Sequence, residues 1–443
     1  MKPPLAPPPL SVLADGLPSE RFRRIIGAAI GATSSGAYRH WDTLRHLTPP
    51  DGLDVRDWWI GTKVARSGML NPLPLTAADG ANYVFAMPDA AWEMLHLIDR
   101  RASGEIGMPA VVTTPELRNR YLVSSLIEEA ITSSQLEGAD TSRAVAKEML
   151  RSGRAPRDRS ERMIANNFRA MNAVRDWKDG ELTPDRILEL HRIVTDGTLD
   201  DPAAAGRLQR PGDERVAVYD RATGEARFLP PPADQLPDRL AAMCRFVNGE
   251  DIGRFVHPVV RSILVHLWLA SDHPFEDGNG RTARALFYWS MLKRGYWLTE
   301  FLSISRILND APARYARSFL YVETDEYDAT YFVLNQLAVI CRAIEDLYAY
   351  LGRKAREVIE TERRLRQADL NHRQKALLAH ALRHPDADYT FRSHQTSHGI
   401  VYQSARTDLL ELERRGFIER ATFGQRFHFR PAQDLVTRLD AEP

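Results

Sequence analysis

The chain has 443 residues, of which 44% are hydrophobic, and this composition favours a globular protein with room for two or three domains. Its 59 Lys and Arg residues balance its 59 Asp and Glu residues, so no overall charge draws it to nucleic acid or to an anionic membrane. Two cysteines, Cys244 and Cys341, are too few for a disulfide framework. They suit a reducing compartment, and the cytoplasm is the default expectation.

Residues 1–110 are expected to form an N-terminal arm and a mostly helical subdomain. Five prolines within residues 3–9 replace the apolar helix that a signal peptide needs, which favours a polyproline arm. A membrane-spanning segment is not expected either, because the most apolar stretch, residues 259–270, contains Arg261 and His266 and is too short to cross a bilayer.

Residues 111–345 are expected to form one mostly helical domain. A helix is predicted to begin at Pro115, with Thr114 as its N-cap. Two short extended runs on either side of a turn predict a single β-hairpin within residues 212–232. Apolar residues three and four apart predict further helices in residues 163–177, 183–197 and 257–270.

The polar sequence HPFEDGNGRTAR, residues 273–284, follows the last of these helices and contains the residue types of a phosphate site. Gly278 and Gly280 allow a tight loop at the start of a helix, where unpaired N–H groups and the positive end of the helix dipole attract anions. Arg281 and Arg284 lie three residues apart, so both guanidinium groups can face neighbouring phosphates. We therefore expect a polyphosphate to bind here.

Two more residues of the loop bring chemistry to this site. His273, as a neutral imidazole, could take the proton from an attacking hydroxyl, and Asp277 is an oxygen ligand suited to the Mg²⁺ that accompanies nucleotide phosphates. Together with the anion site and the arginines, they predict transfer at phosphorus. The alternative, a structural turn with surface charges, is disfavoured by the length and order of the motif. Packing alone is expected of His191, His257 and His266.

The loop matches in full the signature H-P-F-x-D/E-G-N-G-R-x-x-R of the Fic family (filamentation induced by cyclic AMP), and the chain resembles this family over roughly residues 110–345. The resemblance implies an all-α fold, with a Fic-type helical core and a β-hairpin flap. It also implies transfer of AMP from ATP to a Tyr, Thr or Ser hydroxyl of a target protein, with ATP as the substrate and Mg²⁺ as the cofactor.

The same resemblance implies a role for each residue of the loop. His273 would deprotonate the target hydroxyl, and Asp277 would hold Mg²⁺ between the α- and β-phosphates. Asn279 and the loop amides would steady the α-phosphate, while Arg281 and Arg284 would bind the β- and γ-phosphates. The nucleotide is thus expected to contact Gly278, Asn279, Gly280, Arg281 and Arg284.

The flap and the apolar residue of the motif receive different roles from the resemblance. The flap, residues 215–230, would hold a segment of the target protein by main-chain hydrogen bonds, as an added strand does. Phe275 would be a buried anchor and not a catalyst.

The sequence SSQLEG, residues 133–138, resembles the inhibitory motif S/T-x-x-x-E-G/N of the family through Ser133, Glu137 and Gly138. Glu137 would pair with Arg284 and occupy the guanidinium group that the γ-phosphate needs. The enzyme would then be inactive by default. The alternative interpretation of Glu137 is an ordinary acid at a helix end.

Residues 346–443 are expected to form a connector helix and a small winged helix-turn-helix domain. Within residues 370–430 a helix, a short helix, a longer helix and a hairpin around Gly424 follow in the order of that fold, and similar modules are often appended to Fic proteins. DNA binding and a purely structural or partner-docking role are equal alternatives for this domain. The residues that could contact DNA are Arg406, Arg414 and Arg415.

His394 and His398 lie four residues apart in this domain and could share a metal ion, but no third ligand is evident nearby, so both are expected to be solvated.

Two alternatives to AMP transfer stay open. The same site could use another nucleotide donor, or it could remove AMP with Glu137 positioning the water. In a different class, the protein could be a DNA-binding transcriptional regulator whose loop senses a nucleotide, although a sensor has no need of His273. The identity of the target protein and assembly into a homo-oligomer are also left open.

Overall fold

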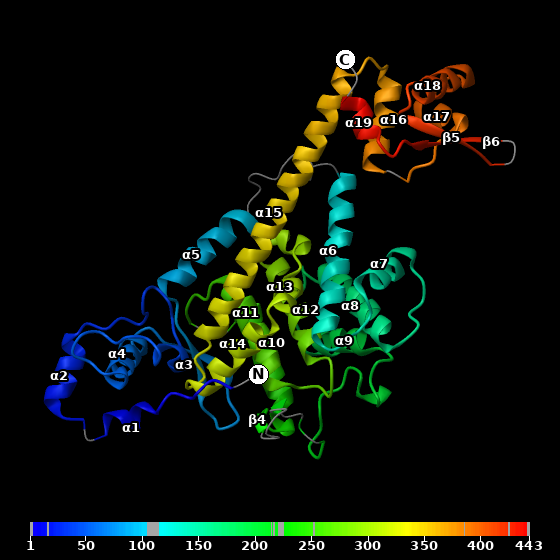
Figure 1. Cartoon of the computed structure of the whole chain (residues 1–443). Helices are drawn as coiled ribbons and strands as arrows, with labels where there is room; N and C mark the ends of the chain where they lie inside the picture. Colours follow the sequence, from blue (N-terminus) through cyan, green and yellow to red (C-terminus); the bar gives the residue numbers. More distant parts are fainter. Residues whose placement is uncertain are drawn as a thin grey trace. The chain divides into compact units, whose positions relative to one another are not determined.

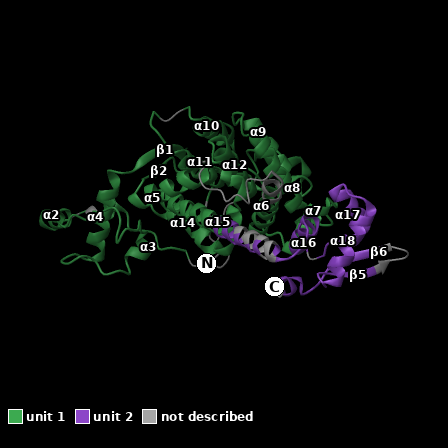
Figure 2. Cartoon of the chain, turned by 90° about the horizontal axis from the view of Figure 1, so that it is seen from above, with its two compact units in different colours: residues 1–107, 115–347 green, residues 108–114, 348–443 purple. Residues whose placement is uncertain are grey.

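The computed structural model describes residues 3–15, 17–103, 115–213, 215, 218–219, 226–250, 253–384, 386–423 and 426–440. These residues form two compact units, and the boundary falls within the long helix α15 (Thr330–Gln367), after Leu347 (Figures 1 and 2). Helices dominate, and the described sheets are two-stranded, which confirms the predicted all-α fold class. None of the helices in the described ranges combines the length and the apolar character that crossing a membrane requires.

The N-terminal part of unit 1 is mostly helical and also contains one hairpin that the sequence analysis did not predict. Lys63 and Arg66, both buried, connect it to the rest of the unit: Lys63 Nζ lies 2.9 Å from the Asp325 carboxylate, and Arg66 donates to the Tyr331 hydroxyl at 2.7 Å. Its elements are α1 (Leu10–Ala14), α2 (Ser19–Gly27), α3 (Trp41–Leu44), α4 (Val55–Ser67), β1 (Asn71–Thr76), β2 (Asn82–Phe85) and α5 (Asp89–Ile98).

The centre of unit 1 is the helix pair α11 (Pro258–Asp272) and α12 (Asn279–Lys293). Nearly all residues of both helices are buried, which suits sequences that are apolar on several sides. The pair holds residues 273–278 between two rigid ends. The remaining helices of the unit are α6 (Pro115–Leu136), α7 (Arg143–Ser152), α8 (Arg159–Asp176), α9 (Pro184–Thr195), α10 (Leu236–Asn248), α13 (Ile304–Asp310) and α14 (Pro312–Thr324).

Several predicted elements of this region are present. The predicted helices in residues 163–177, 183–197 and 257–270 correspond to α8, α9 and α11, and α6 begins at Pro115 as predicted, while Thr114 lies outside the described residues. The predicted hairpin is formed by β3 (Val218–Tyr219) and β4 (Ala226–Phe228), which pair antiparallel. Residues 220–225, between these strands, are also outside the described residues.

Unit 2 packs its helices and one hairpin around a small apolar core. Leu409, Leu412, Phe417 and Phe429 are fully buried in it. The first five elements follow in the predicted order: α16 (His372–Arg383), α17 (Phe391–His398), α18 (Tyr402–Arg414), β5 (Ile418–Phe423) and β6 (Arg426–Pro431). A further helix, α19 (Leu435–Asp440), was not predicted. The assignment as a winged helix-turn-helix stays a prediction.

The expectation that His394 is solvated is wrong. Its side chain is buried where α17 packs on α18, and its Nε2 lies 3.1 Å from the Asp408 carboxylate, which also accepts hydrogen bonds from Arg373. His394 is thus part of a buried polar network. Within the described ranges, no group of three or more His, Cys, Asp or Glu side chains is arranged to hold a metal ion.

A buried carboxylate anchors α6, the helix that ends beside the loop, to α13. Glu129 accepts hydrogen bonds from the Ser305 amide at 3.0 Å, from the Ser303 hydroxyl at 3.1 Å and from the Ser305 hydroxyl. Burial raises the pKa of Glu129, and these bonds offset part of that effect by favouring the charged form. The position of the C-terminal end of α6 therefore depends on a contact two turns earlier in the helix.

Replacing Glu129 by alanine should lower the free energy of unfolding of unit 1 by about 2–4 kcal/mol, because an amide and two hydroxyls lose their buried acceptor. All eight tryptophans lie in unit 1, so urea unfolding followed by their fluorescence measures this unit. Glu93→Ala, at an exposed position of α5, is the control and should change this free energy by less than about 0.5 kcal/mol. Equal effects of the two changes would refute the anchoring role.

Candidate functional site

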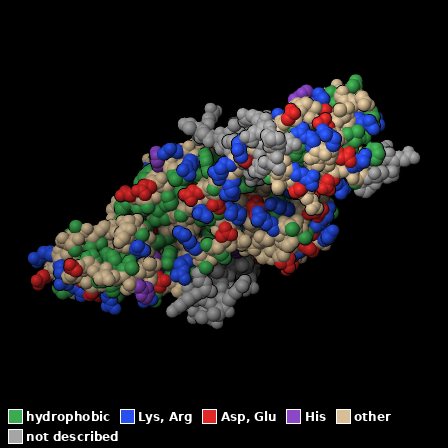
Figure 3. Space-filling view, turned by 45° about the horizontal axis from the view of Figure 1, so that its top comes forward, with side chains coloured by type: hydrophobic (Ala, Val, Ile, Leu, Met, Phe, Trp, Pro, Cys, Tyr) green, Lys and Arg blue, Asp and Glu red, His purple; other side chains and the backbone are tan. Residues whose placement is uncertain are grey.

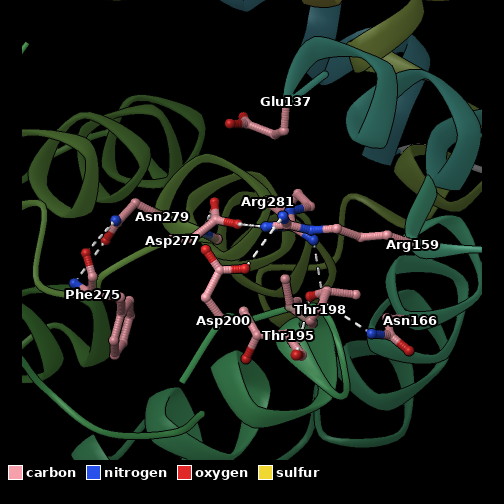
Figure 4. Close-up of polar contacts among 12 residues, drawn as sticks. Glu137, Arg159, Asn166, Thr195, Thr198, Asp200, Phe275, Asp277, Asn279 and Arg281 are labelled. Carbon is pink, nitrogen blue, oxygen red and sulfur yellow. Dashed lines mark hydrogen bonds and ion pairs between the residues drawn. The ribbon is translucent and has the colours of Figure 1, made fainter. Parts of the chain in front are cut away.

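The loop between α11 and α12 is formed by residues with unusual backbone conformations. His273 caps the end of α11 in the left-handed region, with φ +43°, and Gly278 precedes α12 with φ +82°. A Cβ atom on Gly278 would lie 2.7 Å from the Thr195 methyl group, so both the backbone angle and the space require glycine. The loop is therefore folded tightly against α9 (Figure 4).

The side-chain amide of Asn279 closes this loop. Its Oδ1 accepts from the Phe275 N–H at 3.0 Å, and its Nδ2 donates to the Phe275 carbonyl at 2.8 Å and lies 3.3 Å from His273 Nδ1 (Figure 4). The ring of Phe275 is fully buried and stacks on His191 at a centroid distance of 3.7 Å. Asn279 thus orients the loop backbone and contacts the histidine.

His191 supports the loop in a way that the sequence analysis missed. Its Nδ1 accepts from the Gly206 N–H at 2.9 Å, so the neutral ring carries its proton on Nε2, which donates to the Asp277 carbonyl at 2.9 Å. Burial lowers the pKa of His191 to about 4 and keeps this ring neutral near pH 7. A single histidine in an apolar helix gives no sequence signal for this role.

His273 is held at the start of the loop as a neutral imidazole. Burial, with a smaller contribution from the positive charge of Arg215, lowers the pKa of His273 to about 4. The ring is therefore unprotonated near neutral pH, as general base catalysis requires.

The predicted contact between Glu137 and Arg284 is present. Arg284 Nη2 donates to Glu137 Oε1 at 2.8 Å and to the Ser133 carbonyl at 2.9 Å, and its Nε donates to the Ser133 hydroxyl at 2.8 Å. Burial acts to lower the pKa of Arg284, whereas the Glu137 carboxylate acts to raise it, and the net shift of the pKa is upward. A Cβ atom on Gly280 would overlap Glu137 Oε1, so a larger residue there would displace the Glu137 carboxylate from its present position.

Gly138, the last residue of the SSQLEG motif, follows Glu137 with a backbone φ of +96°, in the left-handed region that favours glycine. The chain turns there just after α6 ends, and the Ala139 amide donates to the Ser134 carbonyl at 3.0 Å. Gly138 thus has a backbone role beside the contact that Glu137 makes.

The side chain of Arg281 is fully buried, whereas an arginine in an open phosphate site is accessible to the ligand. It donates to the Val194 carbonyl at 3.3 Å and to Asp277 Oδ2 at 3.2 Å, and burial lowers its pKa. In this arrangement its contacts orient the Asp277 carboxylate, and its predicted role as a phosphate ligand stays a prediction.

Asp277 is the candidate metal ligand, and its side chain is 40% exposed. Besides Arg281, the carboxylate faces Arg159, which lies 3.7 Å from it and 3.7 Å from Asp200 (Figure 4). One accessible carboxylate beside two cations fits a Mg²⁺ ion that phosphate oxygens also bind, since Mg²⁺ commonly uses one or two carboxylates, waters and phosphates. It does not fit an ion bound by the protein alone.

We predict that the His273 ring titrates at a pH of about 4, well below the ordinary histidine value of 6.5, because burial disfavours its charged form. NMR of the full chain with ring-labelled histidine measures the midpoint, and the signal is assigned by its loss in His273→Gln. A midpoint at the ordinary value would contradict the buried environment described here.

The Fic/DOC family model matches residues 181–291, which include α9, the hairpin and nearly all of the α11–α12 pair. The protein adenylyltransferase fic-1 of Caenorhabditis elegans is 34% identical over 116 residues, which are 26% of this chain and 20% of that protein. The protein adenylyltransferase Fic of Nematostella vectensis is 26% identical over 229 residues, 50% of this chain and 51% of that protein. The chain therefore spans between a fifth and about half of the length of these curated relatives.

A solved structure shows the same fold. The crystal structure of a Fic family protein from Desulfovibrio desulfuricans G20 aligns with a TM-score of 0.54 at 19% identity, and the match covers 78% of this chain and 96% of that chain. The family model also includes the loop, with Gly278 and Asn279, whose geometry is described above. The chain therefore carries a Fic domain over residues 181–291.

Proposed function

We propose that the protein transfers AMP from ATP to a Tyr, Thr or Ser hydroxyl of a target protein. The observation that carries this proposal is the pairing, in one loop, of a neutral His273 with the N-terminal end of α12 and the guanidinium group of Arg284. These groups match the three needs of the reaction: a base, an anion site and a ligand for the leaving group. The curated relatives named above are protein adenylyltransferases.

In the proposed reaction, His273 takes the proton of the target hydroxyl while the oxygen of that hydroxyl forms a bond to the α-phosphorus. The bond from the α-phosphorus to the bridging oxygen breaks, and pyrophosphate leaves. The first amides of α12, at Asn279 and Gly280, lack partners within the helix and would stabilise negative charge on the α-phosphate. Asp277 would hold a Mg²⁺ ion, which supplies charge neutralisation for the departing pyrophosphate.

The Glu137 contact supports an inactive resting state. Arg284 donates through Nη2 to Glu137 and to the Ser133 carbonyl and through Nε to the Ser133 hydroxyl, so these two nitrogens are engaged in the contact. A γ-phosphate that needs Arg284 must displace the carboxylate, and ATP that cannot displace it would bind in a pose unsuited to in-line attack. Glu137 is therefore proposed as an inhibitory residue.

The flap is proposed to bind the target. Its strands β3 and β4 form a two-stranded sheet, and residues 229–235 connect this sheet to α10. An extended target segment could pair with a strand edge and place its hydroxyl near His273. Removal of AMP, with Glu137 positioning the water, or use of another nucleotide donor is the alternative chemistry of the same site.

A DNA-binding regulator is the second candidate function, and the helix order of unit 2 favours it. The exposed surfaces of α17 and α18 carry Arg392 and Arg406. Over the described side chains visible in Figure 3, however, Lys and Arg mingle with Asp and Glu and form no continuous basic surface. This mixture of charges gives no support to DNA binding, so the enzyme is the preferred candidate.

We propose three domains for this enzyme: residues 1–110, 111–345 and 346–443. The last domain is proposed to be a winged helix, and the enzyme is proposed to be cytoplasmic.

Glu137→Gly should raise AMP incorporation about tenfold to a hundredfold, because the charge-assisted hydrogen bond that it removes is worth about 1.5–3 kcal/mol. Incubation of the full chain with labelled ATP, followed by intact-mass analysis, measures the added nucleotidyl group on the chain itself. Adding His273→Ala to the same protein should abolish incorporation.

Gln135→Gly is the matched control for Glu137→Gly, because it loosens the same end of α6 without touching Arg284. It should leave incorporation at the level of the unchanged protein. If Glu137→Gly shows no nucleotidyl addition to itself or to any protein in a cell extract, the proposed activity is wrong. Specific, ATP-coupled retardation of DNA fragments that persists in His273→Ala would support the regulator instead.

Gly278→Ala should weaken ATP binding at least about tenfold, because the added methyl group displaces the loop from Thr195 and moves the amides that face the phosphates. Gly295→Ala is the matched control: its φ of +85° imposes similar backbone strain, but no atom lies within 4 Å of the added Cβ. Calorimetric titration of both variants in the Glu137→Gly background compares them. Equal ATP affinities of the two variants would argue against a phosphate site at this loop.

A further inference from the structure

Arg215, at the base of the flap, makes contacts that the proposed reaction does not use. Its guanidinium group donates through Nη2 to the Asp272 carbonyl at 2.7 Å and through Nη1 to the His273 carbonyl at 3.2 Å. Its Nε donates to the Pro231 carbonyl at 3.0 Å, and Nη1 also donates to the Gln209 side chain. One side chain therefore joins both legs of the flap to the residue that carries the proposed base.

A nearby residue of the same segment, Gln209, completes this arrangement. The Gln209 amide donates to the Pro274 carbonyl at 2.9 Å, so three consecutive carbonyls, of residues 272–274, accept from the segment that leads into the flap. Carbonyls at the end of a helix have no partners within it, and a cation beside them is favourable. Arg215 thus supplies a C-terminal cap for α11.

A second arginine also holds the turn. Arg239, on α10, donates to Asp272 Oδ1 through Nε at 2.8 Å and through Nη2 at 2.6 Å, and it donates to Thr76 of β1. Arg239 fixes the side chain of Asp272, whereas Arg215 fixes its main chain. Of the two, only Arg215 also contacts the carbonyl of His273.

The backbone of His273 needs such support. A left-handed conformation is unfavourable for a residue other than glycine, by about 1 kcal/mol or more, and it persists only where surrounding contacts determine it. The His273 amide donates to the Leu269 carbonyl at 3.0 Å, and its carbonyl accepts from Arg215. The direction of the imidazole therefore depends on where the flap holds this guanidinium group.

We propose that Arg215 is a positioning residue that couples the flap to His273, so that a target segment docked on the flap also fixes the orientation of the base. The coupling rests on the proposed AMP transfer. It assigns Arg215 no contact with ATP, because its partners are carbonyls of the turn and of the flap base, together with Gln209.

The test compares Arg215→Met and Arg215→Lys in the full chain carrying Glu137→Gly. We expect kcat for AMP transfer to fall about a hundredfold in Arg215→Met, since a misplacement of about 1 Å has an effect of this size, while KM for ATP stays within about twofold. The kcat of Arg215→Lys should lie between those of Arg215→Met and the parent, because an ammonium group cannot span the same set of carbonyls. The control is Arg210→Met, at an exposed position of the same segment, which should match the parent.

Amide hydrogen exchange gives a readout that does not depend on activity. In Arg215→Met, peptides covering residues 226–232 and 269–276 should both exchange faster, while residues 279–293 should be unchanged. Faster exchange of the first peptide alone would overturn the coupling, as would an unchanged kcat or a parallel rise in KM for ATP.

Two remaining outcomes are also decisive. If Arg215→Met does not fold, an unchanged kcat in Arg215→Lys overturns the proposal, and a reduced kcat with an unchanged KM for ATP supports it. If the Glu137→Gly parent shows no transfer at all, the proposed function fails. The exchange pattern then decides the role of Arg215 separately.

Discussion

The conformation of the site depends on the side-chain amide of Asn279, which pairs with both backbone groups of Phe275. This pairing closes the loop, and the ring of Phe275 then fills the space beneath it against His191. Neutral groups thus determine the backbone at Phe275, in the middle of the loop. The charged side chains of Glu137 and Arg284 are free to face each other across Gly280, where charge is useful for chemistry.

Much of the loop could be predicted from the sequence because its requirements are local. The sequence motif contains each of them at neighbouring positions: a glycine at the positive φ of residue 278, a helix that begins at the next residue and an arginine about one turn later. The same holds for the helices of unit 1, whose apolar spacing gives α8, α9 and α11 directly. The contact between Glu137 and Arg284 spans 147 positions, and it was predicted only because a family resemblance relates the two motifs.

Other parts of the site could not be predicted because their contacts are distant in sequence and their residue types are common. His191 lies 86 positions from Asp277, and Arg215 lies 57 from Asp272. A histidine on an apolar helix does not predict such a contact, and an arginine before a hairpin does not predict one either. The hairpin of β1 and β2 was missed for a local reason, since Pro72 and Pro74 weaken the strand signal.

The anchoring of α6 by Glu129 confines the adjustable part of the contact between Glu137 and Arg284 to one side chain. The helix can stay packed on α13 while the Glu137 carboxylate, 27% exposed, rotates about its own torsions. Rotamer exchange of accessible side chains takes picoseconds to nanoseconds, whereas displacing a packed helix takes microseconds or longer. A change of the Glu137 rotamer would therefore separate the carboxylate from Arg284 on the faster of these timescales, without displacement of the packed helix.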